Sequence, residues 1–495
     1  MSISMDLIFQ SLSLLLFILF ATSTYFLFNH KNYSNSKNLP PGSAGWPIIG
    51  ETIEFLYETP ENFINHRTKK YSSQVFMTNI FRRPTAIFSG PAGSKFISSN
   101  DQKLLKVWYP PSQRSLFQMN RPNPTPTPTP SPSQPSPATQ PQPKTLTSAS
   151  GFLRPEARYV AKFDSFTKSF LRSYLEAKQE VVEVYPFAKT FTLTLACNYF
   201  MGLEDSERAE NLVGKFDDLA MGIHSMDLNF PGTIFHRASK AAAELRKELG
   251  IFIEEKRVKM SSNNGVVKED LLSQLIAGNQ SGRKFTPPEK IVETMLGLLT
   301  ASYSSAATVI TFMVKHIGER PDIYQKILSE QSEIWSTREG SDEEIGWEHI
   351  YRMKYTWAVA CETMRLVAPL QGAFREAITD FTFAGFTIPK GCKIYWAVNM
   401  TNKNPEYFPD PERFDPSRFE GEHGGSHPPY SFIPFGGGPR MCTGRDYARL
   451  VILTFIHNLV NKFKCQVLYP SEKILSSLMM PTPAQGLPVR LHPLP

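Results

Sequence analysis

The sequence has few cysteines, and no two of them are spaced as a pair. Only five occur in 495 residues, and no CxxC motif is present, which argues against a zinc site built on cysteines. An odd, scattered set also argues against a disulfide scaffold and favours a reducing compartment. No basic cluster is interleaved with aromatic side chains, and the net charge of +7 is modest. The sequence therefore gives no support for nucleic-acid binding, although its positive charge suits anionic lipid or an acidic partner.

Charge is also almost absent from residues 7–28, a run dominated by Leu, Ile and Phe. At about 1.5 Å per residue, a helix of this length can cross a hydrocarbon core of about 30 Å. Lys31 and Lys37 place the positive side after the run. A cleaved signal peptide is the alternative, but it would have a basic start and a shorter apolar stretch. We therefore expect residues 1–30 to form an uncleaved, single-pass membrane anchor, with the rest of the chain in the cytosol.

Proline, in contrast, is abundant and gathers in two places. Residues 31–50 contain Pro40, Pro41 and Pro47, and proline resists helix formation, so a stiff, non-helical hinge is predicted there. Residues 120–146 form a Pro/Thr-rich run with almost no apolar side chain. Such a run buries too little surface to offset its ordering entropy, so polyproline II or disorder is expected. It interrupts what we interpret as one domain over residues 51–495.

Helical patterns dominate the chain after this run. A long, mostly apolar helix over residues 291–317 suits a central buried position. A charged helix over about residues 238–260 is predicted to bury one side, formed by Leu245, Leu249, Phe252 and Val258. Pro321 is suited to the first turn of a further helix.

Strand patterns are fewer. Residues 75–90 are typical of two short strands around a turn. Period-two alternation returns over residues 381–398 and predicts a strand pair whose turn is Pro389-Lys390-Gly391. Many helices with a small sheet on one side indicate a mainly α fold with an α+β layout.

The strongest chemical signal is the segment FGGGPRMCTG, which runs from Phe435 to Gly444. Its glycines, Gly438 among them, let the backbone approach a flat ligand closely. Cys442 directly precedes an apolar helix, whose N-terminus stabilises a thiolate, and Arg440 can pair with a carboxylate on the ligand. Together these groups suit a haem with its propionates, with Cys442 as the axial ligand of the iron. For a cysteine taken alone, a buried free thiol in a glycine-rich turn is the alternative.

The spacing of phenylalanine, glycine, arginine and cysteine in this segment resembles the haem-binding loop of the cytochrome P-450 family. The resemblance covers essentially the whole chain outside residues 118–148 and implies that family's fold, with a large helical part and a small β-rich part. It also implies haem b as cofactor and electrons from NADPH, delivered by NADPH–cytochrome P-450 reductase. The anchor would then hold the protein on the endoplasmic reticulum membrane.

Two upstream motifs strengthen the resemblance. Glu362-Thr363-Met364-Arg365 matches the family's ExxR motif, and PERF at residues 411–414 matches the segment whose arginine completes an ion network. The resemblance thus implies a structural network formed by Glu362, Arg365 and Arg413. It also implies a contact between Arg375 and a haem propionate, for which an ordinary surface arginine is the alternative.

Several phrases, such as LPPGSAGWPIIGE and FREAITDFTFAGFTIPKG, resemble plant β-amyrin oxidases and taxane hydroxylases. This resemblance implies a bulky, lipophilic triterpenoid, diterpenoid or sterol-like substrate that is hydroxylated with molecular oxygen. The family layout implies pocket walls around Leu296, Ala301, Leu370, Ala373 and Met480.

The chain departs from the family's pattern at two points. On the long central helix, Ser304 stands in place of the usual acid and Ser305 in place of the threonine that assists oxygen activation. A serine hydroxyl can relay a proton, but it cannot supply one as a carboxyl group does. The Pro/Thr run also replaces a helix that carries a Trp/Arg-type pair facing the haem propionates.

These departures leave two alternatives to a monooxygenase. One is a haem-thiolate isomerase or dehydratase, which needs neither dioxygen nor a reductase. The other is a catalytically defective family member or tethered scaffold that lacks an intact haem-facing helix. The Pro/Thr run itself is a true insertion, a decayed segment or a translated intron.

Overall fold

The computed structural model describes residues 12–20, 22, 38–47, 49–72, 74–119, 155, 157–176, 181–262, 270–280, 286–336, 345–421, 427–476 and 480–494. The predicted Pro/Thr run at residues 120–146 lies outside the described residues, and so does the position of the helix that it replaces.

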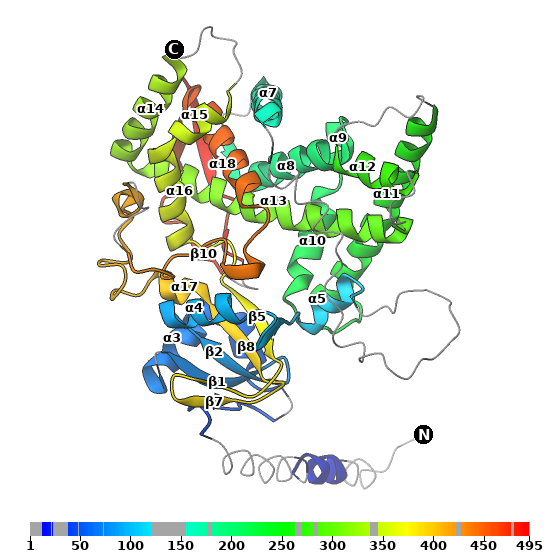
Figure 1. Cartoon of the computed structure of the whole chain (residues 1–495), viewed down its shortest axis with the longest axis vertical. Helices are drawn as coiled ribbons and strands as arrows, with labels where there is room; N and C mark the ends of the chain where they lie inside the picture. The colour runs from blue at the N-terminus through cyan, green and yellow to red at the C-terminus, as the bar shows by residue number, and fades with distance from the viewer. Residues whose placement is uncertain are drawn as a thin grey trace, which may run out of the picture.

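Helices make up most of the described chain, and Figure 1 shows them stacked above a smaller part that is rich in strands. The α-helices are α2 (Thr52–Tyr57), α3 (Pro60–Lys70), α4 (Gly90–Asn100), α5 (Pro111–Leu116), α7 (Ala157–Glu176), α8 (Val184–Ala196), α9 (Ser206–Glu210), α10 (Val213–Ile223), α11 (Ile234–Ser262), α12 (Leu271–Gln280), α13 (Pro288–Glu319), α14 (Pro321–Ser336), α15 (Trp347–Arg352), α16 (Lys354–Leu366), α17 (Val398–Asn402) and α18 (Arg445–Val460). Three shorter segments are the π-helical η2 (Cys197–Met201) and the 3-10 turns η3 (Pro416–Phe419) and η4 (Gly438–Arg440).

The strands form four sheets. The largest has the order β1-β2-β8-β5-β3, a second has the order β4-β12-β9, and two are hairpins, β6-β7 and β10-β11. Their bounds are β1 (Val75–Ile80), β2 (Arg83–Phe88), β3 (Leu105–Val107), β4 (Val181–Glu183), β5 (Gly372–Ala377), β6 (Phe381–Phe383), β7 (Phe386–Ile388), β8 (Lys393–Ala397), β9 (Phe463–Val467), β10 (Ile474–Leu475), β11 (Thr482–Pro483) and β12 (Pro488–Pro493). The five-stranded sheet lies at the end of the molecule opposite the C-terminus (Figure 1), so the predicted layout is confirmed for it, whereas β4-β12-β9 packs among the helices.

The helix α13 is the axis of the helical part. It contacts α8, α11, α16 and α18, and nearly all of its side chains from Tyr303 to Ile317 are buried. This confirms the prediction of a central helix at residues 291–317. Among the described residues, α13 is also the helix that is long and apolar enough to cross a bilayer, but 67% of its most apolar window is buried inside the protein. Its apolar composition therefore reflects core packing.

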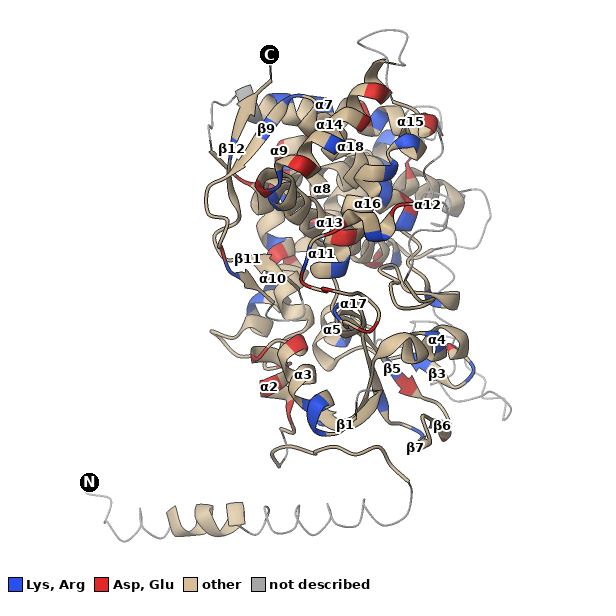
Figure 2. Ribbon diagram, turned by 90° about the vertical axis from the view of Figure 1, so that its left-hand side faces the viewer, with Lys and Arg blue, Asp and Glu red and all other residues tan. Residues whose placement is uncertain are grey.

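The predicted membrane anchor is only partly described. Residues 12–20 are helical, and their large apolar side chains are between 51% and 68% exposed. In Figure 2 this stretch carries no charged residue and lies apart from the body. An exposed, uncharged helix of this composition is compatible with lipid, and the anchor stays a prediction.

The described part of the predicted hinge is non-helical and packs along the edge of the large sheet. The Met77 N–H donates to the Pro41 carbonyl at 2.8 Å, and the Ser43 N–H donates to the Met77 carbonyl at 3.1 Å. A Cβ atom at Gly42 would lie 1.9 Å from the Met77 oxygen, so only glycine permits this close approach. The chain that leads from the anchor is thereby fixed to β1.

The hairpin prediction at residues 75–90 is confirmed, because β1 pairs with β2 in antiparallel register around Phe81 and Arg82. The second strand prediction is partly wrong. β6 turns back at Ala384 and Gly385 to pair with β7, whereas β8 joins β2 and β5 in the large sheet. Every side chain of β8 is buried, so a centrally placed strand has no exposed face that could maintain the predicted alternation.

The predicted buried side of α11 needs one correction. Leu245 and Leu249 are buried, but Val258 is 59% exposed. The buried stripe continues instead through Ile253, Lys256 and Met260. At about 100° per residue, Val258 lies some 220° around the helix from Leu245 and faces solvent.

This register predicts a clear difference between two matched truncations on α11. Leu249→Ala should destabilise the protein by about 2–5 kcal/mol, because a buried leucine leaves a cavity. Val258→Ala should change the free energy of unfolding by less than about 0.5 kcal/mol. Thermal or urea unfolding in detergent measures both, and equal effects would contradict the observed register.

Candidate active site

The cysteine loop is closed by its own backbone. The Cys442 N–H donates to the Phe435 carbonyl at 2.7 Å, and the Gly436 N–H donates to the Ile433 carbonyl at 2.8 Å. Within it, η4 ends where the Met441 N–H donates to the Gly438 carbonyl at 3.1 Å. The loop therefore presents Cys442 in a defined place directly before α18.

The loop is seated on α4 through its glycines. Gly438 has φ +66°, and a Cβ atom there would lie 1.9 Å from the carbonyl oxygen of Ser98. A Cβ atom at Gly437 would lie 2.8 Å from the Ser98 hydroxyl. Any larger residue would push the loop off α4, so the glycines predicted to admit a flat ligand also fix the loop to the protein.

Cys442 is exposed, whereas the other four cysteines are buried. Desolvation by the surrounding protein raises the pKa of the Cys442 thiol, although a hydrogen bond from the Gly444 backbone and the charge of Arg445 lower it. Burial and these two groups thus act on the pKa of the thiol in opposite directions, and burial is the largest effect. A coordinated metal ion would deprotonate a thiol, so a ligand role suits this cysteine.

Two arginines from distant parts of the chain meet beside the loop at Asp101. Arg440 Nε lies 3.1 Å from Asp101 Oδ2, and Arg375 Nε lies 3.7 Å from Asp101 Oδ1. The Asp101 side chain is only 2% exposed. The two residues predicted to hold haem propionates are thus brought together, around a carboxylate that the sequence did not single out.

The cluster brings two positively charged side chains to one carboxylate. Two guanidinium groups share one carboxylate, and the buried Nε of Arg375 makes no hydrogen bond within the described protein. Burial lowers the pKa of Arg375, and the charge of Arg440 adds to that effect, while Asp101 opposes it. A ligand with carboxylates would compensate this charge, so the donor set fits haem propionates.

The Glu362–Arg365 pair is fully buried in α16. Arg365 Nε donates to Glu362 Oε2 at 2.7 Å, and Nη2 donates to Oε1 at 2.8 Å. Burial raises the pKa of Glu362, and the hydrogen bonds from Arg365 oppose that shift. The pair also joins separate segments: Arg365 donates to the carbonyls of Asn402 and Arg413, and Glu362 accepts from the Asp415 N–H.

The predicted third member of this network, Arg413, needs correction. Its side chain is 71% exposed and lies 3.8 Å from Asp415, so only its carbonyl reaches Arg365. Arg418 takes the predicted position, with Nε 3.6 Å from Glu362 Oε1. The sequence carried the signal, because PSRF at residues 416–419 repeats the PxRF pattern of PERF five residues later. Only packing decides which arginine turns inward.

The two serines of α13 have different environments. Ser304 is buried, whereas Ser305 is half-buried and donates to the Ala301 carbonyl at 3.1 Å. Ala301 is exposed and lies one turn before Ser305 on the same face. Directly before the two serines, the buried Tyr303 donates to Asp217 Oδ1 of α10 at 3.0 Å. That bond fixes the rotation of α13, with Ser305 toward open space and Ser304 toward the core.

The predicted pocket walls differ in exposure and stay a prediction. Leu296 is fully buried in the main core. Leu370 is 48% exposed, and Ala373 and Met480 are half-buried, so these three and Ala301 are accessible to a ligand.

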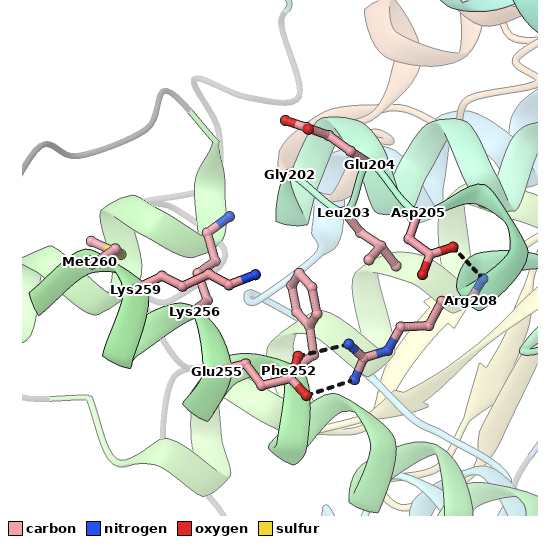
Figure 3. Close-up of a pocket in the computed structure, with 10 residues that line it drawn as sticks. All are labelled: Gly202, Leu203, Glu204, Asp205, Arg208, Phe252, Glu255, Lys256, Lys259 and Met260. Atoms are coloured by element: carbon pink, nitrogen blue, oxygen red, sulfur yellow. Dashed lines mark hydrogen bonds and ion pairs between the residues drawn. The ribbon is translucent and has the colours of Figure 1, made fainter. Parts of the chain in front are cut away.

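A cavity of about 360 Å³ lies elsewhere, between α11, α9 and the loop at residues 202–205 that precedes α9 (Figure 3). It is lined by charged pairs, such as Arg208 with Glu255 at 2.7 Å, and by Phe252. None of its lining residues is a predicted site residue, and its charged walls do not suit a lipophilic substrate.

Taken together, the exposed cysteine on a glycine-seated loop, the arginine cluster and the buried Glu–Arg pair on a mainly helical body fit the class of haem-thiolate proteins. The cytochrome P450 family model matches residues 40–488. The chain belongs to the cytochrome P450 family.

Its relatives are similar over nearly their whole length. The chain is 42% identical to a β-amyrin 28-monooxygenase from Vitis vinifera, over 99% of each protein. It is 43% identical to a β-amyrin 6-beta-monooxygenase from Solanum lycopersicum, over 97% of this chain and 98% of that one. Among solved structures, retinoic acid-bound cyanobacterial CYP120A1 aligns with a TM-score of 0.79 and 27% identity, over 93% of this chain and all of that one.

Membership confirms the expected class of activity and its cofactor. The chain is an oxidoreductase of the monooxygenase type, which incorporates oxygen from O₂. Its cofactor is haem b, and its electrons come from NADPH through a reductase.

The two PxRF arginines provide a matched test of the network. Arg418→Ala should cost about 3 kcal/mol or more, because it leaves the buried Glu362 with fewer partners. Arg413→Ala should cost less than about 1 kcal/mol, since its side chain is exposed. Thermal unfolding together with haem content measures both variants. A larger loss for Arg413→Ala would contradict the assignment of Arg418.

Proposed function

We propose that this protein hydroxylates a triterpenoid of the β-amyrin type at the endoplasmic reticulum membrane. The observation that carries the proposal is the near full-length identity of 42–43% to plant enzymes named for β-amyrin oxidation. A lipophilic substrate also agrees with the apolar and half-buried residues around Ala301, Leu370 and Met480. The exposed apolar helix at residues 12–20 supports delivery from a membrane.

In this proposal the Cys442 sulfur would hold the haem iron, and Phe435, Gly438 and Gly444 belong to the loop that would hold the ring. Arg375 and Arg440 bind the propionates from the cluster at Asp101. When bound, a thiolate-ligated haem activates dioxygen for insertion into an unactivated C–H bond. The protein's own contribution is to hold the sulfur, orient the ring through its carboxylates and admit an apolar substrate.

Ser305 is the proposed proton relay. Its hydroxyl donates to the Ala301 carbonyl, which leaves the oxygen free to accept a hydrogen bond from water or ligand. Ser304 is buried toward the core and bears no carboxyl group, so we assign it no proton donation from its side chain. Protons then arrive through water and the Ser305 hydroxyl, and this route is slower than delivery from a nearby acid.

The proposal is tested by producing the full chain in microsomes with a P450 reductase, NADPH and β-amyrin. Wild type should give a strongly red-shifted Soret band after reduction under carbon monoxide, together with a hydroxylated triterpenoid detected by mass spectrometry. Cys442→Ser should lose both, and Cys465→Ala, which alters a buried cysteine in β9, should keep both. Haem binding without any product from β-amyrin or related triterpenoids would contradict the proposed substrate class.

Two serines about one turn apart on α13, Ser305 and Ser302, provide a test that distinguishes a proton relay from a role in helix packing. Ser305→Ala should lower the product formed per NADPH consumed by about tenfold or more, because general acid–base groups contribute about 10²–10⁴ in rate. Ser302→Ala is the control, since its hydroxyl also bonds within α13, to the Leu299 carbonyl at 3.2 Å. If both variants form equal amounts of product per NADPH consumed, Ser305 has no part in the mechanism.

A further inference from the structure

We propose that Asp101 is a positioning residue for the haem, which holds Arg375 and Arg440 so that both guanidinium groups meet the propionates together. The inference rests on the proposed function, because it requires the haem to bind at the Cys442 loop. It adds a residue that touches the arginines and acts on the cofactor only through them.

The place of Asp101 in the fold supports this role. It is the first residue after α4, where the backbone becomes extended (φ −62°, ψ 135°). The same helix supports the cysteine loop, since Ser98 packs against Gly437 and Gly438. A shift of α4 would therefore move the loop and the carboxylate together, and this keeps Asp101 in register with Cys442.

The two arginines come from two separate elements of the fold, and both side chains approach Asp101. Arg375 lies in β5, where it pairs in register with Val107 of β3, and Arg440 lies in η4. Two like charges at this separation repel each other, and the repulsion is strong where water is scarce. A buried carboxylate between them offsets the repulsion. Arg440 Nε donates a hydrogen bond to Asp101 Oδ2 at 3.1 Å, whereas Arg375 Nε is held by charge alone, 3.7 Å from Oδ1.

The neighbouring charges on the sheet are already paired with one another. Glu376, the next residue on β5, faces the opposite side of the strand and binds Lys106 at 3.1 Å and Lys393 at 2.8 Å. Asp101 is accordingly the carboxylate that the described structure offers to both Arg375 and Arg440. Two cations thus face one carboxylate here, an arrangement that suits a ligand edge that carries carboxylates.

This role has particular weight in this chain. The family's helix with a Trp/Arg-type pair facing the propionates is replaced in the sequence by the Pro/Thr run. Within the described residues, Arg375 and Arg440 are then the groups proposed to contact the propionates. In this proposal Asp101 orients both of them. The opposite role is also conceivable in physical terms: a carboxylate that competes with the propionates would weaken haem binding.

The test is the rate of haem loss from the full-length holoprotein to excess apomyoglobin. If Asp101 positions the arginines, Asp101→Asn should release haem about 10–100-fold faster, as is typical when a partner of a ligand-holding group is removed. Asp101→Glu keeps the charge and should restore most of the retention. Glu255→Gln is the control. It removes the α11 partner of Arg208 from an ion pair at the surface, and it should leave the rate of haem loss unchanged. Slower haem loss in Asp101→Asn would identify a competitor and overturn the proposal.

A second measurement separates positioning from general damage to the fold. Haem dimethyl ester lacks the propionate charges, so wild type and Asp101→Asn should release it at equal rates. In an Arg375→Gln background, Asp101→Asn should add much less than its effect in wild type, because the two residues act as a unit. If the Asp101→Asn effect persists in full with the ester, the residue is merely structural and the inference fails.

The outcomes also separate this inference from the proposed function. Wild type that binds no haem would overturn both. Wild type that binds haem and oxidises triterpenoids, with haem loss unchanged in Asp101→Asn, would overturn the inference alone.

Discussion

The fully buried pair of Glu362 and Arg365 ties together the half of the molecule that supports the haem loop. Both side chains are completely excluded from solvent, and burying two charges is costly unless their hydrogen bonds are satisfied. Here Arg365 donates to the carbonyl of Asn402, the last residue of α17, and Glu362 accepts from the Asp415 N–H. Arg418 adds its positive charge, with Nε 3.6 Å from Glu362 Oε1. The pair thus fixes the proline-rich chain from the end of α17 to η3 against α16. The cysteine loop lies further along the same chain.

A second constraint acts at the loop itself, where space rather than charge is decisive. Gly437 and Gly438 admit α4 so closely that Ser98 occupies the volume of their missing side chains. Since Asp101 directly follows α4, the same helix positions the Cys442 loop and the meeting point of Arg375 and Arg440. The proposed sulfur ligand and the proposed propionate-binding arginines are therefore positioned by the same helix, which suits a planar cofactor that must be held at its iron and at its edge.

The activity proposed for this arrangement depends on α13 in a different way. Packing of Tyr303 against Asp217 rotates the helix so that Ser305 and Ala301 face open space and Ser304 faces the core. In the proposed mechanism, the serine that stands in place of the usual acid removes a proton donor and leaves no buried carboxylate at this position. The proposal therefore predicts an intact central helix with a slower proton supply.

The sequence by itself determined the family, the long central helix, the β1–β2 hairpin and the cysteine loop, because each depends on local periodicity or on a fixed spacing of a few residues. It could not distinguish Arg413 from Arg418, the exposed Val258 from its buried neighbours, or the partner strands of β8, since these depend on which face packs against distant chain. Nor did it single out Asp101, an ordinary acid near a helix end. Only the tertiary structure brings Asp101 to Arg375 and Arg440, because contacts between residues hundreds of positions apart are set by packing and not by local pattern.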